Sequence, residues 1–291
     1  MFVSHVALVS QTNRVPLGQL TLASAAIQKQ ISRDFGPIWN IEATIDSFER
    51  LTDVPLGYWP IIILDNIHEN AQGIHKNKAN GQPFALVQFS QNWALTTSHE
   101  CLEMLADPSG NRTQAGDSVK PDQERVEYLV EVCDPSEAAK FGYSVNGILL
   151  SDFYTPKFFE PMAAPGVRYS FTGAITEPRQ VLDGGYLSWF DPISSHVFQL
   201  FVTGSNKEFI DRGKLPGGFG SLRAFADRFS TKHRMAAMTA AGRASLHLVS
   251  ALGPGGGLMG EIAGPSEFDL AVDASAASLQ EQIDALVNNT Q

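Results

Sequence analysis

Residues 98–107 carry the side chains of this chain whose types and spacing are best suited to chemistry. The stretch reads Ser-His-Glu-Cys-Leu-Glu-Met-Leu-Ala-Asp, which sets His99, Glu103 and Asp107 four residues apart. On a helix, these three side chains leave one face at successive turns. An imidazole and a carboxylate one turn apart can hold a metal ion, and Glu100 stands beside the imidazole. The spacing therefore predicts a metal-binding helix.

The stretch resembles the active-site helix of the zincin metallopeptidases. Within that family the resemblance is to a gluzincin-like peptidase of a bacterial or phage type. In that family the motif HExxH supplies two zinc ligands and a catalytic glutamate. Here the motif is HExxE, because Glu103 stands where the second histidine is expected. The resemblance covers about residues 1–160. It implies that His99 and Glu103 bind the metal and that Glu100 is the general base of peptide-bond hydrolysis.

The resemblance also implies a third metal ligand, which in gluzincins is a glutamate on a downstream helix. We expect that helix over residues 122–134, with Glu127 and Glu131 on its polar face. Glu131 is the first choice of ligand and Glu127 the second. Asp107 and Asp134 are further alternatives, and either could instead support the imidazole by accepting its free N–H.

Because Glu103 stands where the family has a histidine, the motif is compatible with more than one activity. An extra carboxylate makes the centre less positive, so that it would acidify a water molecule less. Zn²⁺ is the metal that we expect first, but the additional carboxylate also makes the site suitable for Mn²⁺ or Fe²⁺. The alternative to a peptidase is a catalytically inactive zincin-like scaffold or binding module in a larger phage- or secretion-type assembly. A third reading needs no metal: Thr97 and Glu100 form a capping box and His99 lies on the surface.

Other candidate residues are two tyrosines and two histidines. Tyr143 is predicted to donate a hydrogen bond to the developing negative charge, a role that Tyr154 could take instead. The alternative is that both are core or interface aromatics. His68 and His75 flank an Asn-rich stretch and either line a cleft or lie in a surface loop.

Hydrophobic periodicity predicts the elements that position these residues. In chain order we expect a strand over 3–9, a helix over 20–35, and strands over 39–48, 61–64 and 84–89, followed by the helix of the HExxE motif. A substrate would lie along 84–89 or along 74–78 as the edge strand. A hairpin is expected over 143–150.

The fold class that we expect is α+β, with a boundary at the Pro- and Gly-rich residues 161–166. Residues 1–162 would form a zincin-like domain in which a twisted mixed sheet backs the active-site helix. Residues 163–291 would form an accessory region without catalytic groups. It would hold strands within 169–203, a helix over 222–251, a Gly-rich linker and a short last helix. This region could also mediate homo-oligomers or contact an assembly partner.

Composition narrows the class of protein. The 291 residues are 43% hydrophobic and 18% charged, as in a globular domain. The net charge of −10 argues against nucleic acid as a partner. No apolar run is long enough to span a membrane and the first residues lack a signal-peptide pattern, so a cytoplasmic location is expected. Cys101 and Cys133 are expected to be buried free thiols, with a pairing across packed helices as the alternative.

Overall fold

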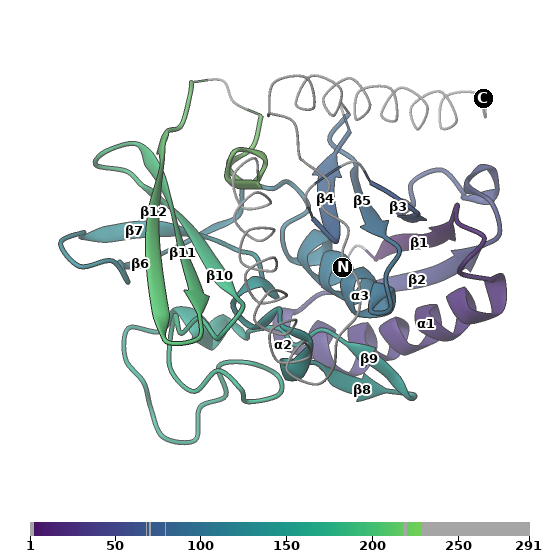
Figure 1. Ribbon diagram of the computed structural model, residues 1–291, viewed down its shortest axis with the longest axis horizontal. Helices are drawn as coiled ribbons and strands as arrows, with labels where there is room; N and C mark the ends of the chain where they lie inside the picture. The colour runs from purple at the N-terminus through teal and green to yellow at the C-terminus, as the bar shows by residue number, and fades with distance from the viewer. Residues whose placement is uncertain (1–2, 68, 70, 79, 218–219, 228–291) are drawn as a thin grey trace, which may run out of the picture.

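A computed structural model describes residues 3–67, 69, 71–78, 80–217 and 220–227 (Figure 1). Two five-stranded sheets and a short hairpin pack together with a few helices. The molecule is therefore of the mixed α+β class that the sequence predicted. Among the described residues, no helix combines the length and apolarity that crossing a bilayer requires.

The first sheet is formed by the N-terminal part of the chain, in the strand order β2-β1-β3-β5-β4. Four strands run parallel, namely β1 (Ser4–Ser10), β2 (Ala43–Phe48), β3 (Trp59–Leu64) and β5 (Pro83–Gln88). They confirm the four strands expected in this region. The fifth strand, β4 (Gly73–Asn77), pairs antiparallel with β5 at the edge of the sheet. It lies in a polar stretch that has no strong strand pattern.

A long helical segment covers one part of this sheet. It runs from α1 (Leu17–Lys29) through the π-helical η1 (Gln30–Phe35) into α2 (Gly36–Trp39). The buried residues of α1, among them Leu20 and Ile27, form the apolar stripe that the sequence predicted. The segment ends at Asn40, whose positive φ of 54° stops the helix.

Helix α3 (Trp93–Ala106) carries the HExxE motif and packs against β5, β4 and the hairpin. The helix begins five residues before Ser98. The capping-box reading is therefore wrong, because Thr97 lies inside the helix and bonds the carbonyl of Trp93. Every residue from Leu95 to Ala106 is buried, polar ones included. The polar face of α3 thus points into the molecule and needs partners there.

The second sheet has the order β12-β11-β10-β7-β6. Its strands are β6 (Thr113–Asp117), β7 (Arg125–Leu129), β10 (Tyr186–Asp191), β11 (His196–Thr203) and β12 (Asn206–Lys214). The prediction of a helix over 122–134 is wrong, because strand β7 occupies the middle of this range. Val126 and Tyr128 alternate with the more exposed Glu127, and this period of two suits pairing with β6 and β10.

The second sheet takes strands from both sides of residue 162, because β7 pairs with β10. The two regions expected from the sequence therefore share a sheet, and the domain division itself stays a prediction. The expected hairpin is confirmed as β8 (Tyr143–Val145) and β9 (Ile148–Leu150). Residues 222–227 are helical. The remainder of the helix expected over 222–251, the linker and the last helix lie outside the described residues.

Candidate metal centre

Ionisable side chains from three elements converge on the buried face of α3. The helix contributes His99, Glu100 and Glu103, the edge strand β4 contributes His75, and the segment that follows β7 contributes a set of acidic groups and a thiol: Glu131, Cys133 and Asp134. We call these seven residues the α3 cluster. Their exposed fractions are 6% or less. Burial of so many charged groups is costly unless they are paired or bind a cation.

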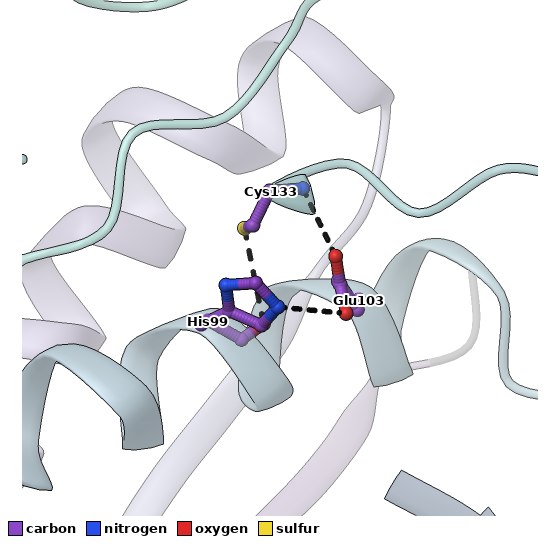
Figure 2. A group of neighbouring side chains, drawn as sticks. All are labelled: His99, Glu103 and Cys133. Carbon is purple, nitrogen blue, oxygen red and sulfur yellow. Dashed lines mark hydrogen bonds and ion pairs between the residues drawn. The ribbon is translucent and has the colours of Figure 1, made fainter. Parts of the chain in front are cut away.

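His99 lies at the centre of one half of the α3 cluster (Figure 2). Its Nε2 is 3.2 Å from Glu103 Oε2 and 3.3 Å from Asp134 Oδ1. The backbone N–H of Cys133 donates to the other oxygen of Glu103 at 3.1 Å, and the Cys133 thiol lies 3.8 Å from the His99 carbonyl oxygen. One donor atom from each of His99, Glu103 and Cys133 lies within 4.8 Å of the others.

His75 organises the other half of the α3 cluster. Its Nδ1 lies 3.0 Å from Glu100 Oε2 and 3.8 Å from Glu103 Oε2, and its Nε2 lies 3.5 Å from Glu131 Oε2. Donor atoms of His75, Glu103 and Glu131 form a second group within 4.8 Å. Figure 1 shows how β4 runs beside α3, which allows a strand side chain to meet a helix side chain here.

Several metal-ligating atoms of the α3 cluster make no well-directed hydrogen bond to any described residue. They are Nε2 of His75, Oε1 of Glu131 and Oδ1 of Asp134, together with the neighbouring hydroxyl of Tyr154. Buried polar atoms in folded proteins nearly always have a partner. Imidazole nitrogens and carboxylate oxygens are common ligands of divalent cations, so these residues fit a metal ion.

The pKa values show how the cluster balances its charges without a cation. Burial lowers the pKa of His99, but the charge of Glu103 and the contact with Asp134 outweigh it and raise this pKa well above the usual range. Burial raises the pKa of Glu103, but His99 brings it down to about 2. Burial, with the charge of Glu103, raises the pKa of Glu131 and of Asp134 well above normal. Protons held by His99, Glu131 and Asp134 therefore offset the negative charge.

Two of the four third-ligand candidates lie elsewhere. Glu127 lies on β7 and accepts a hydrogen bond from Thr113 on β6. Asp107 ends α3, and its carboxylate accepts the backbone N–H groups of Asn111 and Arg112 at 3.1 and 3.0 Å. It holds the turn after the helix and does not support the imidazole of His99.

The other two candidates, Glu131 and Asp134, belong to the α3 cluster. Asp134 is the one beside His99, whereas Glu131 faces His75. His75 and Cys133 were not predicted as ligands. Their approach to α3 depends on the packing of β4 and of the segment after β7, for which the sequence gives no local signal.

The structure places the two candidate tyrosines in different surroundings. The Tyr143 hydroxyl donates to Asp34 at 3.0 Å and accepts from Gln30 at 3.1 Å, and both partners belong to η1. Tyr154 is fully buried, and its pKa is raised well above normal by burial and by the charges of Glu131 and Glu103. Tyr154 is thus the tyrosine near the α3 cluster. His68 lies outside the described residues, and the two cysteines are free and buried as expected.

Arg223 reaches the α3 cluster from the C-terminal region. It is only 2% exposed, and its guanidinium donates to the Asp107 carbonyl at 3.0 Å and to Asn77 Oδ1 at 3.1 Å. It thereby joins the end of α3 to the end of β4. Burial first, and then the positive charge of Arg223, lower the pKa of His75, whereas at Glu131 the same charge only partly opposes the rise in pKa that burial causes.

Comparisons of this chain with models of protein families, with curated proteins and with solved structures give no match. Conclusions about its function therefore rest on the geometry of the α3 cluster.

Proposed function

We propose that the α3 cluster binds a divalent metal ion and that the protein is a metal-dependent peptidase. One observation carries this proposal. The imidazole of His99 lies between carboxylate oxygens of Glu103 and Asp134, and Oδ1 of Asp134 has no well-directed hydrogen bond to a described residue. Such convergence of buried donors costs free energy without a cation to bind them.

His99, Glu103 and Asp134 would hold the ion, with Asp134 in the role first given to Glu131. The two carboxylates make the site suitable for Zn²⁺ and also for Mn²⁺ or Fe²⁺. When bound, the ion would polarise the scissile carbonyl group and acidify a water molecule. The thiol of Cys133 lies close enough to tune this site, but its raised pKa makes it a poorer donor than the carboxylates.

Glu100 would act as the general base. It follows His99 directly, and its Oε2 is held by His75, which fixes the direction of the carboxylate. Glu100 would take a proton from the attacking water and pass it to the leaving amine. Tyr154, in place of Tyr143, would donate a hydrogen bond from its hydroxyl to the developing oxyanion.

The substrate would add to β4 as an extended strand. Of the two stretches expected to form the edge, 84–89 is internal because β5 lies between β3 and β4, whereas β4 is the last strand of the sheet. β4 therefore has a side on which a peptide could pair with its backbone. The same strand carries His75 into the α3 cluster, which would bring the substrate close to the metal.

A second candidate function is a non-catalytic scaffold with a structural metal centre, as part of a larger assembly. The burial of the α3 cluster favours it, since even its most exposed member, Glu131, is only 6% exposed. A structural metal site is closed by its ligands, whereas a catalytic site keeps a position for water and substrate.

Metal analysis and peptide hydrolysis separate these functions. We expect bound metal in the wild type, a loss in His99→Ala, and no loss in His196→Ala, a half-exposed histidine of β11 that pairs with Asp211. Hydrolysis of a mixed peptide library by the metal-loaded protein would support the peptidase. Bound metal without hydrolysis would support the scaffold. A wild type that binds no metal at micromolar free zinc would refute both.

A further inference from the structure

We infer that the α3 cluster has a second metal position, held by His75 and Glu131 and bridged by Glu103 to the position at His99. This inference rests on the proposed metal centre and extends it from one ion to two. His75 comes from the edge strand and not from the HExxE motif, so the second position would be a property of the fold.

The bonding of His75 prepares its second nitrogen for a metal. Nδ1 lies 3.0 Å from Oε2 of Glu100, and an ionised carboxylate can only accept, so in that state the ring proton sits on Nδ1. Nε2 then presents a lone pair. It is buried, lies 3.5 Å from Glu131 Oε2 and makes no hydrogen bond to a described residue. Histidine ligands of metals usually donate their other N–H to a carboxylate in this way.

The position at His75 is distinct from the position at His99. Donor atoms of His75, Glu103 and Glu131 lie within 4.8 Å of one another, whereas His99 belongs to two other such groups, one with Glu103 and Cys133 and one with Asp134 and Glu137. Within the described part of the chain, no such group contains both histidines. Glu103 belongs to both groups, with Oε2 at 3.2 Å from His99 and 3.8 Å from His75. A carboxylate shared in this way is suited to bridge two ions about 3.5–4 Å apart.

The charge of the α3 cluster also favours two ions. Its four carboxylates, on Glu100, Glu103, Glu131 and Asp134, carry a formal charge of −4 when ionised. One divalent ion would leave two negative charges buried, whereas two ions would offset all four. Arg223 adds one positive charge that acts on Glu131. A first bound ion would displace the protons that otherwise offset this charge, and buried charge left uncompensated is strongly destabilising, so the full donor set is better matched to a pair of ions.

Titration of the chelator-treated full-length protein with Mn²⁺ tests the second position. We expect two equivalents in the wild type and an electron paramagnetic resonance spectrum of exchange-coupled ions. His75→Gln should bind one equivalent and give the spectrum of an isolated ion. His99→Gln should also keep one equivalent. The matched control His196→Gln, altered at a histidine remote from this cluster, should keep two equivalents and the coupled spectrum.

Other stoichiometries would overturn the inference. A single equivalent in the wild type that persists in His75→Gln would refute the second position and leave the proposed centre at His99 intact. A single equivalent lost in both variants would show one shared site, which also refutes it. No binding at all would refute the metal centre itself. If His75→Gln does not fold by circular dichroism, Glu131→Gln must show the same loss of one equivalent and of the coupling.

Discussion

His75 and Glu100 join the edge strand β4 to helix α3 through a buried contact of 3.0 Å between Nδ1 and Oε2. The strand that would bind a substrate therefore also fixes the carboxylate that would act as the base. A shift of β4 relative to α3 would move His75 and so change the orientation of the Glu100 carboxylate. Substrate binding and proton transfer are thus expected to depend on the same packing contact.

Replacement of Glu100 by glutamine should separate folding from catalysis. The amide oxygen can still accept the N–H of His75, so we expect the metal content to be retained. Removal of the general base should lower kcat by about 10²–10⁴-fold. Measurement of metal content and of peptide hydrolysis on the same preparation checks both points. Hydrolysis at the wild-type rate would remove Glu100 from the mechanism.

A side chain at Gly73 should disturb the contact between β4 and α3. A Cβ atom there would clash with Glu100 Oε1 and would lie 2.6 Å from Thr96 Cγ2. We expect Gly73→Ala to lower the free energy of unfolding by about 1–3 kcal/mol. The matched control is Gly18→Ala, because Gly18 is helical and no described atom outside its chain neighbours and the nearby helix backbone lies within 4 Å of the added methyl group. That control should be neutral or stabilising by up to about 1 kcal/mol. Urea denaturation measures both, and equal effects would refute the close packing.

The metal-free protein should lose stability as the pH rises from about 5 to 8. The pKa values of Glu131 and Asp134 are raised from their usual 4.5 and 3.8, so the unfolded chain releases these protons before the folded protein does. The raised pKa of His99 acts in the same direction above its usual value of 6.5. Since the folded state binds more protons, the free energy of unfolding falls with rising pH. Within the α3 cluster, Glu103 and His75 act in the opposite direction. The pKa of Glu103 is lowered to about 2 and burial lowers the pKa of His75, so each adds stability that is lost on acidification below its usual value of 4.5 or 6.5.

A bound metal should reverse this dependence, because its ligands must lose their protons to bind it. Urea denaturation at pH 5 and pH 8, with chelator and with zinc, measures the two slopes. In Glu131→Gln the metal-free slope should be shallower. An identical slope in the presence and absence of zinc would mean that these groups are not the ligands.

Loss of the Arg223 guanidinium should destabilise the junction between the C-terminal region and the α3 cluster. Arg223→Met keeps much of the side-chain volume but removes the bonds to the Asp107 carbonyl and to Asn77. Hydrogen bonds from a buried charged group are each worth about 1.5–3 kcal/mol, so a loss of at least about 2 kcal/mol is expected. The control Arg125→Met removes a side chain that is 70% exposed and should change stability by less than about 0.5 kcal/mol. Comparable losses in the two variants would contradict this role.

Local patterns predicted the parts of the fold in which neighbouring residues decide the structure. The apolar runs around Ile61 and Phe84 gave buried strands, and the four-residue spacing of His99 and Glu103 gave a helix with both on one face. The segment after residue 122 was misassigned because Val126 and Leu129 suit a helical stripe as well as a strand. The segment forms a strand because it pairs with β10, which lies about sixty residues later in the chain.

The composition of the α3 cluster could be predicted only in part for the same reason. His99, Glu103 and Glu131 were expected, but β4 lies in a polar stretch and its His75 reaches α3 only through tertiary packing. Asp134 was a secondary candidate, and its position beside His99 depends on the path of the chain after β7. No spacing rule within the sequence describes contacts that form between separate elements.

The two sheets differ in how far apart in the chain their paired strands lie, and this has a consequence for folding during synthesis. The first sheet pairs only residues between 4 and 88, whereas β7 gains its second neighbour when residues 186–191 are available. Pairing between distant segments forms slowly, and N-terminal regions fold first as the chain emerges. Residues 131–134 follow β7 directly, so they should be fixed late. A nascent chain would then build its first sheet and α3 well before it could retain a metal ion.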